Sequence, residues 1–168
     1  MVVEIKYSQY ARVSFAFSTL FTIYHLLQWL VIVSPEGKFT NDEMTLPNVY
    51  VTAAIHPGES SGLNAGLMLM RNMVTNTTVD WKANLLFVPI FNVGGYLRQV
   101  PEGRINQHGP NTSGRRGNDR WLNLNRDFGK LDAIETRAVV QVMNDYDISF
   151  YTDTHSTGKV DMHCQHID

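Results

Sequence analysis

The chain has 168 residues, of which 43% are hydrophobic and 18% are charged, with a formal net charge of −2. This composition is that of a globular protein long enough to bury a substantial core, and it excludes a disordered chain. The small negative net charge is unlike that of a nucleic-acid-binding protein, so we expect no nucleic-acid partner. The single cysteine, Cys164, excludes a framework of internal disulfides.

The amino-terminal part is apolar and admits two interpretations. No Asp, Glu, Lys or Arg occurs from Val13 to Ser34, and a run of about 20 apolar residues is long enough to cross a bilayer. His25 and Gln28 interrupt the run, which favours a buried helix or strand followed by a strand over Trp29–Val33. Membrane contact through residues 13–33 therefore stays open, and with it the location of the protein.

Strands and helices alternate in the rest of the chain. Their expected ranges are a strand over 48–55, a helix over 60–73, a strand over 85–91, a helix over about 134–144 and a strand over 148–152. This alternation predicts an α/β fold with a mostly parallel sheet flanked by helices. Such sheets bind ligands beyond the carboxyl ends of their strands.

Local signals mark the helix starts and one long connection. We expect Ser60 or Ser61 to cap the first helix. Asp132 and Glu135 have the spacing of a capping box for the second, with Asp in the Ser/Thr role. The stretch Gly94–Arg120 shows almost no periodicity, and a loop of that length is usually functional, so we interpret it as a wall of the active site.

Residues with metal-ligand chemistry follow two of these strands. His56 and Glu59 lie three positions apart between a strand and a helix, and His155 follows the last strand. An HxxE pair alone occurs widely in surface and capping roles, and a lone histidine is usually a hydrogen-bonded core residue. Together the three supply two imidazoles and a carboxylate, the ligand set of a catalytic zinc that keeps one position for water. We therefore predict a metal-assisted hydrolase.

A second group of residues is suited to binding a carboxylate. Asn125 and Arg126 offer an amide and a bidentate guanidinium, although a solvated turn explains such a pair equally well. Arg116, nine positions before Asn125, is suited to stabilising the oxyanion of a tetrahedral intermediate.

Three strings, HPGESSG (56–62), RINQHGPNTSGRRGNDRWLNLNRDF (104–128) and DTHSTG (153–158), resemble zinc carboxypeptidases of the carboxypeptidase A type, especially a bacterial branch. The resemblance runs from about Trp29 to the carboxyl terminus. It implies a mixed eight-stranded sheet flanked by helices, of which this chain supplies the first part. It also implies one Zn²⁺ ion and a peptide substrate with a free carboxyl terminus.

The resemblance assigns roles to individual residues. The zinc ligands that it implies are His56, Glu59 and His155. The residues that it implies for the substrate are Asn125 and Arg126, which hold the terminal carboxylate, and Ser156, which lines the cleft. Arg116 matches the oxyanion arginine by its place before the Asn-Arg pair, with Arg115 and Arg120 near enough to compete.

Two departures from the family pattern stand out. The family often has Asp two positions before its Asn, as a partner of the first zinc histidine, and here that position is Asn123. The family's general base is a glutamate well downstream of the third ligand, but none of the thirteen residues after His155 is Glu. We therefore expect an amino-terminal fragment: an apolar segment, 1–28, that is core, signal or anchor, and a partial catalytic domain, 29–168, incomplete at its carboxyl end.

Two other functions compete with the carboxypeptidase. One is an amidohydrolase of N-acyl amino acids, like succinylglutamate desuccinylase and aspartoacylase, which share HxxE, NLNR and a later histidine. The other is a non-catalytic zinc- or peptide-binding module, which the missing general base would allow. His163, Cys164 and His166 lie on one short expected strand, where successive side chains face opposite ways, so we expect no second metal site there.

Overall fold

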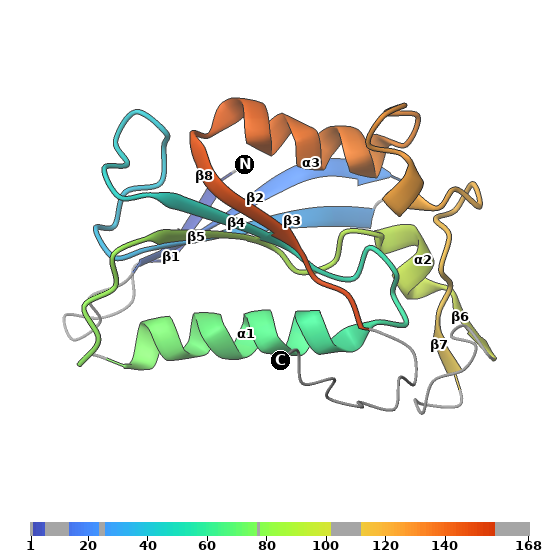
Figure 1. The fold of residues 1–168 in the computed structure, drawn as a ribbon, viewed down its shortest axis with the longest axis horizontal. Coiled ribbons are helices and arrows are strands. Elements are labelled where there is room, and N and C mark those ends of the chain that lie inside the picture. The colour runs from blue at the N-terminus through green and yellow to red at the C-terminus, as the bar shows by residue number, and fades with distance from the viewer. Residues whose placement is uncertain (1, 6–13, 24–25, 77, 102–111, 157–168) are drawn as a thin grey trace, which may run out of the picture.

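A single mixed sheet lies between two helices in the computed structural model, which describes residues 2–5, 14–23, 26–76, 78–101 and 112–156. The sheet has the strand order β1-β2-β3-β5-β4-β8. Its strands are β1 (Val2–Ile5), β2 (Ser14–Ile23), β3 (Leu26–Ser34), β4 (Asn48–Thr52), β5 (Asn84–Val88) and β8 (Ile148–Asp153). Helix α1 (Ser60–Thr75) covers one face and α3 (Ile134–Asp145) covers the other (Figure 1).

The directions of the strands confirm the predicted mixed sheet flanked by helices. β4 pairs in parallel with both β5 and β8, whereas β3 pairs antiparallel with β2 and β5, and β1 pairs antiparallel with β2. Four strands, β2, β5, β4 and β8, therefore run in one direction. All five residues of β5 are buried, because this central strand is covered on both faces.

Each face of the sheet has its own hydrophobic core. The α1 side packs Val31, Val33, Leu63, Met70 and Phe87 together, while the α3 side packs a larger group that includes Tyr50, Leu86, Phe91, Leu124 and Val139. Side chains of a buried strand point alternately to opposite faces, so β3 and β5 contribute to both cores. Leu67, which the helical spacing places with the core residues, is instead 47% exposed.

Two strands are shorter than predicted, because the chain changes its hydrogen-bonding partners at their carboxyl ends. β4 ends at Thr52 rather than Ile55, and β5 ends at Val88 rather than Phe91. Ala53 N–H still donates to Val88 O, but Phe91 N–H then donates to Ala53 O and Asn92 N–H to Ala54 O. Ala54 adopts a φ of 56°, a left-handed conformation that costs a residue with a Cβ about 1–3 kcal/mol. Hydrogen bonds therefore join the segment after β4 to the segment after β5, directly before His56.

The helix caps predicted from local sequence are wrong in both helices. The N-cap of α1 is Glu59, without a capping side chain, rather than Ser60 or Ser61. The N-cap of α3 is Ala133, and the amides of Asp132 and Ala133 donate to the carboxylate of Asp127. Glu135 is turned away from the helix end, because its carboxylate accepts hydrogen bonds from Asn118. Tertiary contacts thus replace the capping box.

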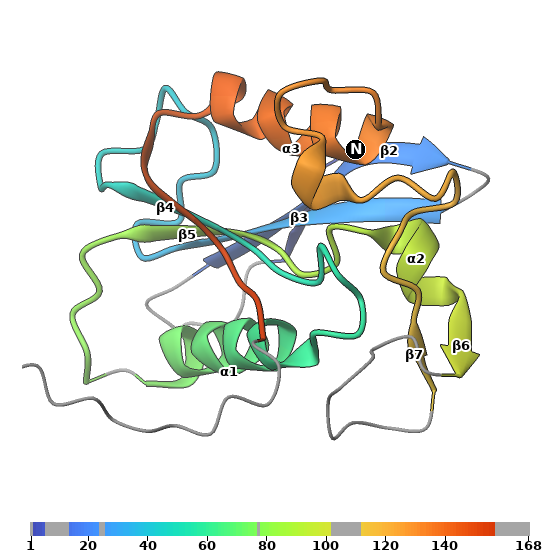
Figure 2. The same cartoon turned by 45° about the vertical axis from the view of Figure 1, so that its right-hand side comes forward.

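The stretch Gly94–Arg120 contains regular structure where none was predicted. Helix α2 (Val93–Leu97) begins at Asn92, whose side-chain oxygen accepts a hydrogen bond from Gly95 N–H. The short strands β6 (Gln99–Pro101) and β7 (Thr112–Gly114) then pair antiparallel beside α2 (Figure 2). The stretch therefore holds a helix and a hairpin at one side of the sheet.

The apolar amino-terminal residues form part of the sheet. Residues of β2 and β3 pair antiparallel from Ser14↔Ser34 to Ile23↔Leu26. Among the described residues, no helix combines the length and the apolar character that a membrane crossing requires. The division into 1–28 and 29–168 stays a prediction, and His163, Cys164 and His166 lie outside the described residues.

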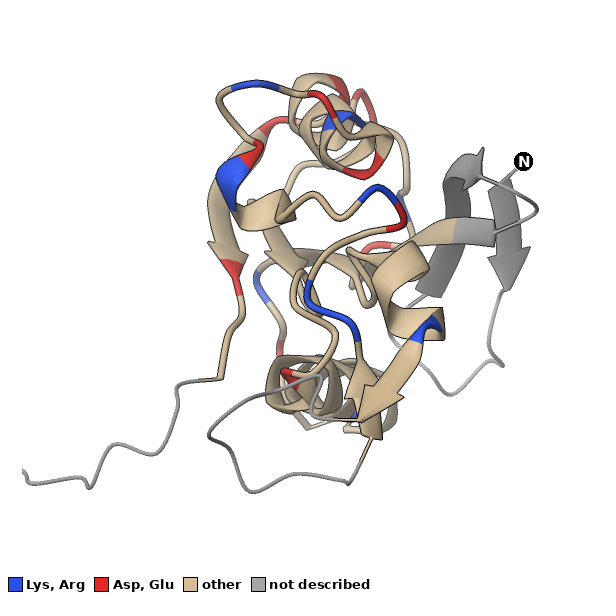
Figure 3. Ribbon diagram, turned by 90° about the vertical axis from the view of Figure 1, so that its right-hand side faces the viewer, with Lys and Arg blue, Asp and Glu red and all other residues tan. Residues whose placement is uncertain are grey.

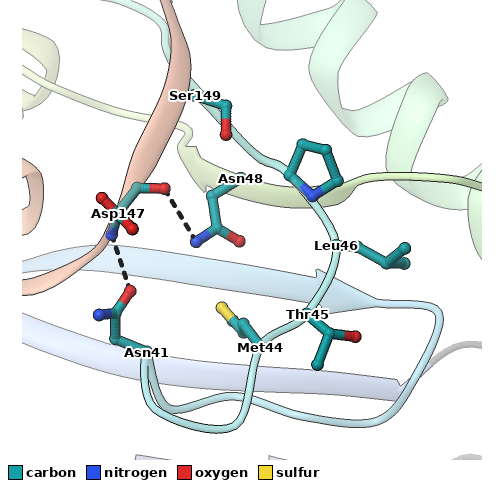
Figure 4. Close-up of a pocket in the computed structure, with 8 residues that line it drawn as sticks. Asn41, Met44, Thr45, Leu46, Asn48, Asp147 and Ser149 are labelled. Carbon is teal, nitrogen blue, oxygen red and sulfur yellow. Dashed lines mark hydrogen bonds between the residues drawn. The ribbon is translucent and has the colours of Figure 1, made fainter.

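At the amino ends of β4 and β8, polar residues surround a cavity of about 300 Å³ (Figure 4). Asn48 Nδ2 donates to the main-chain oxygen of Asp147, and Asp147 N–H donates to Asn41 Oδ1. Asn84 Nδ2 donates to Asn48 Oδ1 at 2.9 Å. These hydrogen bonds hold the connection between β3 and β4 against the ends of the sheet strands.

Candidate metal centre

The three predicted metal ligands meet at the carboxyl ends of two adjacent parallel strands. His56 and Glu59 lie on the connection from β4 to α1, and His155 follows β8, whose Asp153 pairs with Thr52 of β4. Thr154 N–H donates to Thr52 O at 3.0 Å, which keeps the end of β8 against β4. Sequence positions almost a hundred residues apart are thereby brought to one point.

The Glu59 carboxylate lies between the two imidazoles. His56 Nδ1 is 3.0 Å from Glu59 Oε1, and His155 Nδ1 is 2.8 Å from Glu59 Oε2. One ligand atom from each residue lies within 4.8 Å of the other two. Two ligands of a tetrahedral zinc ion are about 3.3 Å apart when each is about 2.0–2.1 Å from the metal. The group therefore needs only small adjustments to enclose one ion.

The hydrogen bonds of His56 leave a lone pair on its Nδ1, which faces the point where the three predicted ligands meet. Asn123 Oδ1 accepts a hydrogen bond from Asn125 N–H, so this atom is the oxygen of its amide, and His56 Nε2, 3.0 Å away, must donate to it. His56 Nδ1 then carries a lone pair facing a carboxylate, an arrangement that a cation between them would stabilise. Burial lowers the pKa of His56 to about 4, against the hydrogen bond to Asn123, so the imidazole is neutral at neutral pH, as a ligand must be.

His155 has a charged partner in place of an amide. Its Nε2 lies 2.8 Å from Asp153 Oδ2 and 3.4 Å from Asn125 Nδ2. Burial raises the pKa of Asp153, while the hydrogen bond from Thr52 and the charge of His155 act in the opposite direction. The ring is 33% exposed, whereas His56 is 3% exposed, so the open side of the centre lies at His155.

The carboxylate ligand of the predicted set, Glu59, is buried at the amino end of α1. It is 5% exposed, and the positive end of the helix dipole favours its negative charge. Ser156 N–H donates to Oε2 at 3.0 Å, and Arg116 Nη1 lies 3.4 Å from Oε1. The Glu59 carboxylate therefore faces the two histidines and does not cap α1.

The sequence profile of zinc carboxypeptidases matches residues 25–164. The chain belongs to the zinc carboxypeptidase family. Zinc carboxypeptidases use one Zn²⁺, and His56, Glu59 and His155 form a group positioned to bind a metal, whose two imidazoles and one carboxylate fit that ion. No curated protein matches the chain significantly.

Solved structures show the same fold. Carboxypeptidase A from Helicoverpa armigera is 15% identical with a TM-score of 0.63, and the match covers 84% of this chain and 41% of that one. A metallocarboxypeptidase from Burkholderia cenocepacia is 19% identical with a TM-score of 0.61, over 89% and 37%. A succinylglutamate desuccinylase from Silicibacter sp. TM1040 is 17% identical with a TM-score of 0.54, over 94% and 44%. The chain thus spans less than half the length of these proteins.

Of the three competing arginines, Arg116 is the one whose guanidinium approaches the metal ligands. Its side chain is 56% exposed. Arg115 is buried, lies over the ring of Trp121 at 3.8 Å, and donates to the main-chain oxygens of Gly117 and Asn118. Lys and Arg residues occur in the loops between α1 and α3 on this side of the molecule (Figure 3). The geometry favours Arg116, whose role stays a prediction.

The predicted carboxylate-binding residues lie on the 3-10 helix Leu124–Arg126, next to the centre. Asn125 Nδ2 is 3.4 Å from His155 Nε2, and Arg126 Nη1 donates to Asn125 O at 2.8 Å. Ser156 N–H donates to Glu59 Oε2, and Ser156 Oγ donates to Ser61 Oγ at 3.1 Å. Asn125, Ser156 and the metal ligands are thus neighbours, while the roles of Asn125, Arg126 and Ser156 stay predictions.

Sequence reasoning missed two supporting groups. Asn92 is fully buried and donates to Ile55 O and Arg116 O, so it ties the His56 connection to the Arg116 loop. Thr52 donates to Asp153 and contacts Tyr151. The only available signal was their position at strand ends, and that position alone does not distinguish them from ordinary strand residues.

Proposed function

We propose that the protein is a zinc metallocarboxypeptidase that hydrolyses carboxyl-terminal peptide bonds. The observation that carries the proposal is the convergence of His56, Glu59 and His155, with Arg116 on one side and Asn125 on the other. When bound, zinc supplies a Lewis acid for the scissile carbonyl and lowers the pKa of water to about 7.

The surrounding residues then bind and orient the substrate. Arg126 offers two parallel N–H donors to the terminal carboxylate, and Asn125 adds an amide next to His155. Arg116, partly exposed beside Glu59, donates to the oxygen on which negative charge develops. Holding a free carboxylate at a fixed distance from the metal restricts cleavage to the last peptide bond.

Hydrolysis of matched peptides tests these roles. Peptides with a free or an amidated carboxyl terminus are compared for the zinc-loaded protein and three variants, Arg126→Ala, Arg126→Lys and Arg116→Ala. Arg126→Ala should weaken binding of peptides with a free carboxyl terminus. Arg126→Lys should retain only part of the parental binding, since lysine lacks the planar guanidinium that donates two parallel hydrogen bonds. Arg116→Ala should lower turnover by about 10²–10³. An unchanged preference for free ends in Arg126→Ala would contradict the carboxylate-binding role.

A second candidate is an amidohydrolase of N-acyl amino acids. The match to succinylglutamate desuccinylase, which covers 94% of this chain, keeps it open. N-acyl amino acids in the same assay separate the two, because an amidohydrolase would prefer them to dipeptides. If zinc binds and neither substrate class is hydrolysed, the result fits both a non-catalytic zinc- or peptide-binding module and a carboxypeptidase whose general-base glutamate is missing from these 168 residues.

A further inference from the structure

The two zinc histidines are supported by different chemical groups. His56 Nε2 faces the neutral amide of Asn123 at 3.0 Å, whereas His155 Nε2 faces the carboxylate of Asp153 at 2.8 Å. A carboxylate makes a ligating imidazole more basic and fixes its tautomer more strongly than an amide does. The stronger support is therefore given to the more exposed of the two ligands.

Asp153 is itself held by a chain of hydroxyl groups from two strands. Thr52 Oγ1 donates to Asp153 Oδ1 at 2.7 Å, and Tyr151 OH lies 3.0 Å from the same Oγ1. A threonine hydroxyl has one proton, so Tyr151 must be the donor in the second contact. Thr52 is fully buried, and it pairs with Asp153 in the register of β4 and β8. The carboxylate is thus fixed on the side away from the metal.

The other carboxylate oxygen is left for His155. Asp153 Oδ2 is buried, and no described group makes a hydrogen bond of good geometry to it, although His155 Nε2 approaches it at 2.8 Å. Asn125 Nδ2, 3.4 Å from His155 Nε2, competes from the other side and would require Nε2 to be an acceptor. The shorter contact with a charged oxygen favours Nε2 as the donor.

We propose that Asp153 is the positioning residue of the zinc centre, holding the proton of His155 on Nε2 so that Nδ1 faces the ion. Thr52 and Tyr151 in turn hold Asp153. Without Asp153, the amide of Asn125 stabilises the opposite tautomer, in which Nδ1 carries the proton and cannot bind zinc. This inference rests on the metal site of the proposed function but not on its carboxypeptidase activity.

Zinc affinity, measured by competition with a chromophoric chelator at neutral pH, tests the inference directly. Asp153→Ala should weaken zinc binding by about 10–100-fold, as is typical for loss of such a partner. Asp153→Asn, which keeps one acceptor, and Thr52→Val, which removes only the support of Asp153, should have smaller effects in the same direction. Asp147→Asn at the opposite end of β8 is the matched control and should bind zinc like the parent.

Urea unfolding of the metal-free variants separates positioning from a loss of stability. A positioning role predicts weaker zinc binding even where the metal-free variant is as stable as the parent. If Asp153→Ala does not fold, Asp153→Asn and Thr52→Val decide the matter by the same measurement. Parental zinc affinity in the folded Asp153 and Thr52 variants would overturn the inference alone. A parent protein that binds no zinc would overturn the metal site as well.

Discussion

The two ends of the parallel strands β4 and β8 use similar residues for different purposes. At the amino ends, Asn84 donates to Asn48 Oδ1, and Asn48 donates to the main-chain oxygen of Asp147 (Figure 4). At the carboxyl ends, Asn123 and Asp153 each contact one nitrogen of a histidine and leave the other nitrogen facing Glu59. At the amino ends, polar groups hydrogen-bond to one another and so stabilise the fold. At the carboxyl ends, they leave one nitrogen of each histidine facing Glu59, and these atoms together form a site.

Removing a ligand at the carboxyl ends should give the largest effect. Loss of a residue that supports a metal ligand typically weakens binding by about 10–100-fold. His56→Ala should weaken zinc binding by more than this, because the ligand atom itself is lost. Chelator competition measures this change. Asn41→Ala, which removes a polar side chain at the amino ends, serves as the control, and an equal loss of affinity there would contradict the distinction between the two ends.

Removing a polar residue at the amino ends should affect stability instead. Asn48→Ala should lower the free energy of unfolding by about 1–3 kcal/mol, since it leaves buried partners unsatisfied. Urea denaturation measures the loss, and the folded variant should bind zinc with parental affinity. Asn64→Ala, an exposed substitution of the same kind on α1, should have little effect. Weaker zinc binding by folded Asn48→Ala would show that this end also shapes the site.

The packing of α1 against the end of β8 offers a sharper comparison between two glycines. A Cβ at Gly62 would meet the Thr154 hydroxyl, next to His155, whereas a Cβ at Gly129 would meet nothing within 4 Å. Gly62→Ala should therefore cost about 1–3 kcal/mol by overpacking, while Gly129→Ala should stabilise by about 0.4–1 kcal/mol through the unfolded chain. Thermal unfolding compares them, and equal changes would argue against the close approach of α1 and β8.

Asp127 should behave as a structural carboxylate although it directly follows Arg126. Burial alone would raise its pKa, but hydrogen bonds from the main-chain amides of Ala133 and Asp132 outweigh this and lower the pKa. Its stabilising contribution is therefore complete above its unfolded-state pKa of about 3.9 and is lost as the pH falls through the lower folded-state value.

Replacing Asp127 with asparagine should cost about 1–3 kcal/mol at neutral pH, because the amide offers one acceptor oxygen where the two carboxylate oxygens each accept a main-chain amide. It should also reduce the loss of stability below pH 4, because one titrating group is gone. Urea unfolding at a series of pH values measures both effects. A parental pH profile in Asp127→Asn would contradict the stabilising role of the Asp127 carboxylate.

The ligand set could be predicted from the sequence because its signals are local. His56 and Glu59 lie within one turn of chain, and a histidine directly after a strand was expected at the carboxyl edge of the sheet. The start of α3 could not be predicted, because Asp127 and Asn118 act from outside the helix that they support. Likewise, the role of Thr52 depends on β8 lying next to β4, a pairing between distant segments.

X-ray absorption at the zinc edge of the purified protein tests the central claim most directly. The account predicts one zinc ion per chain, surrounded by nitrogen and oxygen at about 2.0–2.2 Å with two imidazoles. That signal should disappear in a His56 and His155 double alanine variant. A sulfur ligand at about 2.3 Å, which only Cys164 or a methionine could supply, or an unchanged spectrum in the double variant, would contradict it.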